Sequence, residues 1–410
     1  MALMPDSMFM EKMFMEKMLV SNQITKTLVG FIAVAIWPAL TAAEDQVTLN
    51  RDGAKIHLNG RVVVEAQDGG VLLLDRKGKL WTIQPEEIEE RSKNQFPFRP
   101  LDKKELAAAL LDELPKGFEV HTTAHYLICH NTSKAYAQWC GALFERLYFG
   151  FANFWKRRGM KLHEPEMPLV AVVFGDERSY KRYAVNQLGD AVKSIIGYYN
   201  LLTNHVVMYD LTGSQKIRRG NSRGRNSAEI NKMLSRPEAG SLVATVIHEA
   251  THQIAFNCGL QTRLADIPIW LSEGIAMYFE TPDLNSSNGW RGIGAVNRNR
   301  LVQFRKSLRS RAGDSLVSLL TTDRRIQGRS KDKQYQSRNA VLNAYAESWC
   351  LTFYLMKHKH DEFNDYVKML AAKQPLFEDT PEERREQFEH YFGTLPSLDQ
   401  EFLRQTSKLR

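Results

Sequence analysis

The apolar side chains between residues 241 and 280 follow the spacing of two buried helices. In the first helix they recur every three or four positions and cover most of the surface: Leu242, Val243, Val246, Ile247, Ala250, Ile254 and Phe256. Gly240 and Ser241 suit its N-terminus, and Asn257 with Gly259 suits its end. A second apolar helix is predicted from Pro268 to Glu280, so the middle of the chain should form a helical core.

Residues 46–92 have a different pattern, in which short apolar runs alternate with turn signals. The runs are VTL, KIHL, RVVVEA, GVLLLD and KLWTI, and the turn signals are Asn59–Gly60, Asp68–Gly70 and Lys77–Gly78. They predict a small all-β domain over residues 44–92, either a five-stranded SH3-like barrel or an open meander. A docking module and a passive spacer are both compatible with it. Residues 93–117 are predicted to hold a proline-bearing linker and a short helix, Asp102–Leu114.

Strand and helix patterns alternate over the next hundred residues. Strands are expected at 121–130, 168–175, 194–200 and 205–211, with helices over 133–158 and from Asp176. Beyond Glu280 the spacing is mostly helical, with helices near residues 297–311, 340–359, 362–372, 381–391 and 398–409. The expected fold class is therefore α+β, with one sub-domain over residues 118–285 and a helical C-terminal lobe over residues 286–410.

The first 43 residues predict a signal peptide. Lys26 precedes the apolar run Leu28–Leu40, which is followed by the small residues Thr41–Ala43 and then by acidic residues. This order is typical of a cleaved export signal, and it predicts a secreted, periplasmic or cell-surface protein. The run is short for a membrane span, so no stable span is expected after its removal. An uncleaved anchor is the alternative.

Composition adds a moderate basic bias to this picture. The 410 residues carry a net charge of +8, with 43% hydrophobic and 25% charged residues, which is typical of a globular protein. The positive charge favours anionic surroundings, such as cell-envelope polymers or acidic substrates, and no nucleic-acid partner is expected. The segment 212–227 is polar and rich in Lys and Arg, so it is expected to be a loop. It either is solvated or recognises an anionic polymer.

The cysteines and most histidines do not suggest a separate site. Export would permit up to two disulfides among Cys129, Cys140, Cys258 and Cys350, and the sequence does not fix their pairing. The absence of a C-x-x-C pair argues against a thiolate zinc site. His121 and His125 share one predicted strand without a nearby carboxylate or cysteine, so they are interpreted as ordinary strand residues.

The first buried helix carries an H-E-x-x-H motif. Four residues turn an α-helix through about 400°, so His248 and His252 lie on one face and can hold a single zinc ion. Glu249 lies beside that face and can reach a metal-bound water as a general base. A third ligand is needed, and Glu273 in the second helix offers one. Asp266 could compete with it from the intervening loop.

The two helices together resemble the gluzincin clan of zinc peptidases, which includes the aminopeptidases and thermolysin-like enzymes. HEATHQ-x-x-x-N and WLSEGIA match the aminopeptidase branch at Gln253, Asn257, Trp270, Leu271, Glu273, Gly274 and Ala276. They also resemble a secreted bacterial family of uncharacterised domains. The likeness covers roughly forty residues. It implies a zincin-like catalytic sub-domain with a mixed sheet above the metal helix, Zn²⁺ on His248, His252 and Glu273, and Glu249 as the general base.

The resemblance also implies roles for residues outside the motif. Tyr345, in the helix predicted over residues 340–359, is a loose match to the tyrosine that stabilises the oxyanion in aminopeptidases. The strand 205–211 would be the sheet edge that binds extended substrate. Glu280, two turns after Glu273, is expected either to support a ligand or to lie at an exposed helix end. The G-x-M-E-N run of aminopeptidases is missing, so endopeptidase action is at least as well supported as exopeptidase action.

The sequence therefore predicts a secreted zinc metallopeptidase that hydrolyses peptide bonds in a peptide or protein substrate. A zinc-bound water would attack the peptide bond with Glu249 as base, and Tyr345 would assist. Two alternatives stay open. One is a zinc amidase acting on cell-envelope peptides, and the other is a gluzincin-like scaffold without activity. The presence of Glu249 argues against the scaffold, because a structural zinc site needs no base.

Overall fold

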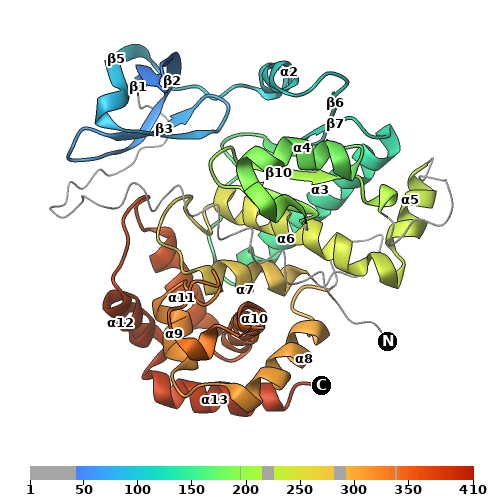
Figure 1. Ribbon diagram of the computed structural model, residues 1–410, viewed down its shortest axis with the longest axis vertical. Helices are drawn as coiled ribbons and strands as arrows, with labels where there is room; N and C mark the ends of the chain where they lie inside the picture. Colours follow the sequence, from blue (N-terminus) through green and yellow to red (C-terminus); the bar gives the residue numbers. More distant parts are fainter. Residues whose placement is uncertain (1–42, 194, 215–225, 281–291, 338) are drawn as a thin grey trace.

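The protein is described by a computed structural model for residues 43–193, 195–214, 226–280, 292–337 and 339–410. It combines a small β unit, a mixed sheet with helices, and a helical C-terminal part (Figure 1). The predicted signal peptide, apart from Ala43, and most of the predicted loop 212–227 lie outside the described residues. Within those residues, no helix has both the length and the apolar character that crossing a membrane requires.

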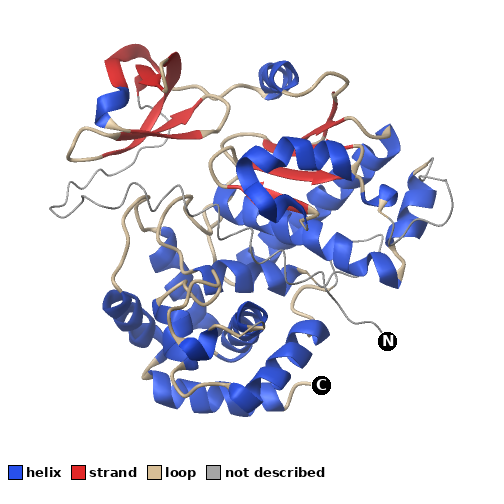
Figure 2. Cartoon of the chain, viewed as in Figure 1, coloured by secondary structure: helices blue, strands red, loops and turns tan. Residues whose placement is uncertain are grey.

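The N-terminal unit is a five-stranded antiparallel sheet, drawn in red at the upper left of Figure 2. Its strands are β1 (Ala43–Arg51), β2 (Ala54–Glu65), β3 (Val71–Asp75), β4 (Leu80–Ile83) and β5 (Ile88–Pro97), in the order β4-β3-β2-β1-β5. Two sequence expectations are wrong. Asn59–Gly60 lies inside β2 and makes no turn, and β5 occupies much of the segment expected to be a linker.

Close packing explains why a glycine stands in the middle of β2. A Cβ atom on Gly60 would lie 2.5 Å from the carbonyl oxygen of Leu74 and 2.8 Å from Cγ of Leu73. The Asn59–Gly60 pair therefore serves a close approach between β2 and β3 rather than a hairpin. The glycine at position 60 is therefore required by strand packing, and not by the hairpin turn that the sequence suggested.

The mixed sheet comprises β6 (Glu119–Thr122), β7 (Tyr126–His130), β8 (Leu169–Phe174), β9 (Gly197–Asn200) and β10 (His205–Tyr209). Their order is β6-β7-β8-β10-β9, with parallel pairing in the centre and antiparallel pairing at both edges. The single strand expected over 121–130 is instead the hairpin β6–β7. Its turn is fixed by Glu145, which accepts hydrogen bonds from Thr123 Oγ1 and His125 N, both at 2.6 Å. His121 and His125 are thus not a ligand pair.

Helices cover both faces of this sheet. Side chains alternate along β7, so that Tyr126 and Ile128 face one core while Leu127 and Cys129 face the other. On the first face lie α3 (Lys134–Lys156) and α6 (Gly240–Asn257), and on the second lie α2 (Lys103–Glu113) and α4 (Glu177–Leu188). The short helix α5 (Ser227–Leu234) packs on α3 (Figure 1). This two-sided covering explains the continuous apolar runs in the central strands.

The C-terminal part is helical, as the sequence predicts. Its elements are α7 (Ile269–Phe279), α8 (Arg298–Ser307), α9 (Ser315–Thr321), α10 (Ala340–His358), α11 (His360–Ala371), α12 (Pro381–Phe392) and α13 (Leu395–Ser407). Helix α7 contacts both α6 and α10. A Cβ atom on Gly274 would lie 2.0 Å from Oγ1 of Thr352, so only glycine allows α10 to approach this closely.

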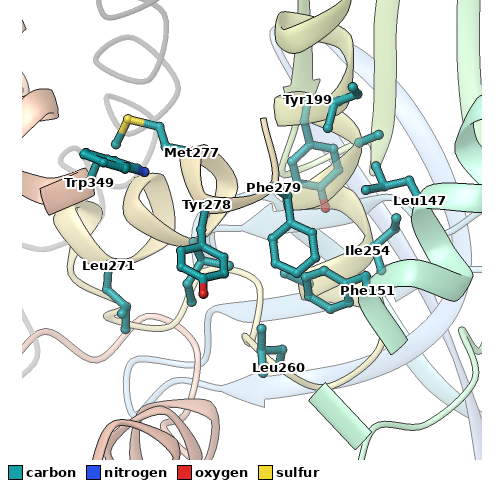
Figure 3. Packing of buried hydrophobic residues seen from close by; sticks show 14 of the residues in the cluster. Leu147, Phe151, Tyr199, Ile254, Leu260, Leu271, Met277, Tyr278, Phe279 and Trp349 are labelled. Carbon is teal, nitrogen blue, oxygen red and sulfur yellow. The ribbon is translucent and has the colours of Figure 1, made fainter. Parts of the chain in front are cut away.

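The core between α3, α6 and α7 is aromatic. In Figure 3, Phe279 of α7 lies against Phe151 of α3, with Leu147 and Ile254 nearby. The centroids of the two phenylalanine rings are 5.0 Å apart, and both side chains are fully buried. This packing continues through Tyr278 towards Trp349 on α10, so α7 is buried along its whole length.

The β unit packs directly on the rest of the protein. Leu72, Leu74 and Leu80 form a small core with Met167 and with Leu202, Leu264 and Leu376. Arg61 makes a bidentate ion pair with Glu166 at 2.8 Å. Arg263, from the loop between α6 and α7, donates from Nη1 to Gly78 O at 3.0 Å and to Leu201 O at 3.2 Å. The unit thus contacts the loops that flank the metal centre described next.

Candidate metal centre

Two adjacent helices bring the predicted ligands together. His248 and His252 lie one turn apart on α6, and Glu273 lies in the first half of α7. His248 Nε2 is 3.0 Å from His252 Nε2 and 3.0 Å from Glu273 Oε2, and His252 Nε2 is 3.4 Å from Glu273 Oε1. All three residues are buried, and together they form a group that could hold a metal ion.

The separations among these atoms fit a small tetrahedral cation. With zinc–ligand bonds of about 2.0–2.1 Å, neighbouring ligand atoms of a tetrahedron lie about 3.3 Å apart. The observed separations of 3.0–3.4 Å match this edge length. Three protein ligands also leave one tetrahedral position open, which is the arrangement of catalytic rather than structural zinc sites. The donor set of two imidazoles and a carboxylate suits zinc and other first-row divalent ions.

A second layer of hydrogen bonds orients both imidazoles. His248 Nδ1 is 2.7 Å from Glu280 Oε1, so this carboxylate accepts the Nδ1 proton and Nε2 is the ring nitrogen directed towards the shared point. His252 Nδ1 is 3.3 Å from Ser272 Oγ, whose own proton goes to Gln261 Oε1 at 3.1 Å. Glu280 also accepts a hydrogen bond from Asn297 Nδ2 at 3.1 Å. Glu280 therefore supports a ligand and is not at an exposed end.

The electrostatics of the group favour a cation at the shared point. Burial would lower the pKa of His248, but the charges of Glu273 and Glu280 outweigh it and raise that pKa to about 10. Burial would raise the pKa of Glu273, yet the two imidazoles hold it well below its ordinary value. With neutral imidazoles, Glu249, Glu273 and Glu280 would carry three negative charges, and in the described part of the chain the Arg300 guanidinium lies 4.0 Å from Glu280. The formal charge of about −2 would be balanced by one divalent ion.

Glu249 faces the edge of the mixed sheet. Its Oε2 accepts a hydrogen bond from the backbone N–H of Tyr199 on β9 at 2.6 Å, and its side chain is buried. The sequence assigned the edge position to residues 205–211, and that expectation is wrong. Strand β10 lies between β8 and β9, and the edge strand beside α6 is β9. A single sequence could not reveal this, because both strands are short and equally apolar.

The remaining motif residues of α6 anchor the helix to the sheet. Gln253 Nε2 donates to Asn204 O at 2.7 Å and to Val170 O at 3.0 Å. Asn257 and Asn204 exchange side-chain hydrogen bonds of 2.7 and 2.8 Å. Asn204 adopts φ of 64° in the β9–β10 turn, a conformation that asparagine tolerates well. These hydrogen bonds fix the position of α6, and therefore of His248 and Glu249, relative to β9.

Two other candidate residues lie elsewhere. Asp266, the rival third ligand, forms an ion pair with Arg384 Nε at 3.0 Å and does not join the histidines. Tyr345 lies on α10 with its ring 5.5 Å from the Arg300 guanidinium, which in turn approaches Glu280. The structure thus links Tyr345 to His248 through Arg300 and Glu280. Its predicted role towards an oxyanion stays a prediction.

The four cysteines are buried thiols, and none forms a disulfide. Burial raises the pKa of Cys129 and of Cys258 to about 12, so neither is a thiolate at neutral pH. The disulfides that export would permit are absent from the structure. The large aromatic core explains why the fold does not depend on them.

Comparison with known proteins gives a family without an assigned activity. Residues 242–377 match a protein family described as "Protein of unknown function (DUF1570)". No curated protein matches the chain. The matched segment begins in α6, contains the three ligands and Glu249, and ends just after α11. It covers a third of the chain, and both the β unit and the mixed sheet lie outside it.

Proposed function

We propose that this protein is a zinc-dependent metallopeptidase of the gluzincin type with a zincin-like catalytic sub-domain. The observation that carries the proposal is the convergence of His248, His252 and Glu273 on one point, with ligand atoms 3.0–3.4 Å apart. The H-E-x-x-H and W-L-S-E-G segments lie on the two helices that create this geometry. Together with the predicted signal peptide, they support a secreted or periplasmic hydrolase.

Each residue of the centre has a distinct task in this proposal. A bound zinc ion would supply a Lewis acid and lower the pKa of a water molecule towards about 7. Glu280 and Ser272 keep the imidazoles in the tautomer that presents Nε2. The Tyr199 N–H donates to Oε2 of Glu249 and so orients the carboxylate, which takes the proton of the attacking water. Glu249 then delivers that proton to the leaving nitrogen.

The position of β9 at the edge of the mixed sheet, beside α6, suits an extended polypeptide. Pairing with β10 uses the main-chain groups of alternate residues, and the Tyr199 N–H points away from β10 towards Glu249. By the period of two, the main-chain groups of Gly197 face the same side. A substrate strand added there would pass the metal centre. The G-x-M-E-N run with which aminopeptidases hold a free N-terminus is missing from the sequence, so endopeptidase action is at least as well supported as exopeptidase action.

Replacing the base tests the proposal. In the Glu249→Gln protein we expect stoichiometric zinc with peptide cleavage reduced about a thousandfold, because general-base catalysis contributes about 10²–10⁴ in rate. Glu386→Gln, an exposed glutamate on α12, is the matched control and should keep both zinc and activity. Zinc is measured by metal analysis, and cleavage by mass spectrometry of a mixed peptide library with and without chelator.

Three outcomes would contradict the proposal. Wild-type protein that holds zinc but cleaves neither library peptides nor cell-envelope peptides would be a scaffold. Cleavage of envelope peptides alone would identify a zinc amidase instead. Glu249→Gln protein with near wild-type turnover would show that the base lies elsewhere.

A further inference from the structure

The positive charge of the chain is concentrated in one segment after the metal helices. Residues 297–338 contain twelve Lys and Arg residues against three Asp residues and no Glu. The segment alone therefore has a net charge of +9, against +8 for the whole chain. It includes α8 and the short 3₁₀ turn Leu308–Ser310 that continues it.

These cations divide into an inward set and an outward set. Arg311 and Arg325 are largely buried and pair with Glu347 at 2.9 and 2.8 Å. Arg298, Lys306 and Arg309 are exposed, and no carboxylate pairs with any of them in the part of the chain that the structure describes. The inward arginines stabilise the fold, whereas the outward cations repel one another without compensation.

The outward cations form a stripe on one side of α8. Arg298, Val302 and Arg305 follow the spacing i, i+4 and i+7 of one face of α8, with Lys306 beside them, and Arg309 follows in the 3₁₀ turn Leu308–Ser310. All are exposed, and Val302 is 50% exposed in the middle of the stripe. The stripe extends about 16 Å along the helix, which is the length of about five residues of extended polypeptide.

The stripe begins beside the metal centre. Asn297, the N-cap residue of α8, donates from Nδ2 to Glu280 Oε2 at 3.1 Å, and Glu280 holds His248. Arg300, in the first turn of α8, approaches the same carboxylate at 4.0 Å. Helix α8 therefore leads away from the ligands, and Figure 1 shows it running from the α7 region towards α13.

We propose that the basic stripe of α8, comprising Arg298, Arg305, Lys306 and Arg309, binds an acidic segment of the polypeptide substrate. This inference rests on the proposed function and adds a preference to it. Because the stripe begins at the metal centre, a substrate polypeptide bound at the metal ligands can extend along α8 and place its acidic segment on the stripe. The exposed Val302 between the cations suits a polypeptide with mixed side chains better than a uniformly charged polymer.

Binding of a defined peptide tests this assignment without needing turnover. The probe is a fluorescent twelve-residue peptide with five consecutive glutamates, compared with its glutamine counterpart. In the Glu249→Gln background, fluorescence anisotropy at low salt should show tighter binding of the acidic peptide. Adding Arg298→Gln, Lys306→Gln and Arg309→Gln should weaken that binding about tenfold, and salt should weaken it in the parent as well.

A matched triple variant controls for net charge. Lys104→Gln, Lys116→Gln and Arg178→Gln remove the same charge from exposed positions near α2 and α4, and they should change the affinity by less than about twofold. The stripe variant should also keep or raise its melting temperature, because it loses only mutual repulsion. A lowered melting temperature together with unchanged binding would show that these cations serve the fold instead.

The failure of this inference can be told apart from failure of the proposed function. Equal binding of both peptides, or tighter binding of anionic vesicles or a sulfated polysaccharide than of the acidic peptide, would overturn the stripe as a polypeptide site. Peptide cleavage could still be present in that case. If binding follows the stripe but wild-type protein cleaves nothing, the peptidase assignment fails and the acidic ligand is not a substrate.

Discussion

Buried carboxylates occupy the metal centre between α6 and α7 and a second cluster between α9 and α10, and the two groups are stabilised differently. In the second group, the arginine cluster, Glu347 accepts from Arg311 Nε at 2.9 Å, from Arg325 Nη2 at 2.8 Å and from Ser315 Oγ at 2.8 Å. Arg311 also pairs with Asp399 Oδ2 at 2.8 Å. Two arginines and two carboxylates thus balance within the protein.

The metal centre does not balance in this way. Its carboxylates outnumber the arginines near them in the described part of the chain, and the two imidazole Nε2 atoms and the Glu273 carboxylate converge on one point. The arginine cluster is neutralised by its own side chains, whereas convergent ligand atoms with excess negative charge favour a bound cation. The difference teaches that burial and short contacts do not by themselves indicate a functional site. The convergence of ligand atoms on one point, together with an excess of negative charge, is the better indicator.

The largest expected effect concerns the arginine cluster. Glu347→Gln leaves Arg311 and Arg325 buried with half of their countercharge, so unfolding free energy should fall by about 3–5 kcal/mol. Urea denaturation with and without zinc measures this loss, and the loss should be the same in both conditions. Glu386→Gln is the exposed control and should change stability by less than about 0.5 kcal/mol. A loss that zinc rescues would mean that the two clusters are coupled.

The same cluster should make stability depend on pH. Burial would raise the pKa of Glu347, but Arg325 and Arg311 outweigh it and lower that pKa below its ordinary value. The unfolded chain then binds the proton first as pH falls, so the contribution is complete above the ordinary value of about 4.3 and is lost below it. Stability measured from pH 7 downward should drop more steeply in wild type than in Glu347→Gln. Parallel curves would contradict the assignment.

A smaller effect is expected at the metal centre. Zinc at a hundred times its dissociation constant should stabilise wild-type protein by about 2.7 kcal/mol, because it binds only the folded state. Glu273→Gln removes one ligand and should abolish most of this zinc-dependent stabilisation. Thermal denaturation over a zinc titration gives the measurement, with Glu386→Gln again as control. Undiminished stabilisation in Glu273→Gln would show that zinc binds elsewhere.

The smallest effect is expected at Glu280. It distinguishes a residue that orients a metal ligand from a residue that binds the metal itself. Glu280 contacts His248 and not the convergence point, so Glu280→Gln should lower zinc affinity about 10–100-fold while keeping stoichiometric binding. Competition with a fluorescent chelator measures the affinity. Complete loss of zinc would instead make Glu280 a ligand, and an unchanged affinity would remove its role in orienting His248.

Local patterns predicted many elements and several helix ends. Helices α2 and α3 begin where the sequence predicts, directly after the N-cap residues Asp102 and Ser133, because an N-cap depends on a few neighbouring residues. The strand patterns were less decisive. Asn59–Gly60 and residues 121–130 were misjudged, since the same residues serve a turn, a close approach or a continuous strand according to what packs on them. Helices α6 and α7 were predicted well because their apolar spacing is long and regular.

The sequence predicted the part of the candidate site that depends on the spacing of residues within a helix or a motif. One helical turn places His248 beside His252, and the motif in the following helix singled out Glu273. No pattern pointed to Ser272 and Gln261 behind His252, or to the Tyr199 N–H on Glu249. A backbone donor carries no sequence signature. The assignment of the wrong edge strand has the same origin, because strand order is a property of the assembled sheet.

The sequence by itself predicted most of the helices and the pair of histidines, since these depend on a fixed periodicity, and its likeness to the gluzincin motif made Glu273 the candidate third ligand. The tertiary structure decided that Glu273 approaches both imidazoles, that Glu280 holds His248 and that β9 faces Glu249. It also decided which arginines are balanced and which are exposed along α8. Those facts depend on side chains distant in the chain meeting in a close-packed core, which only the complete fold specifies.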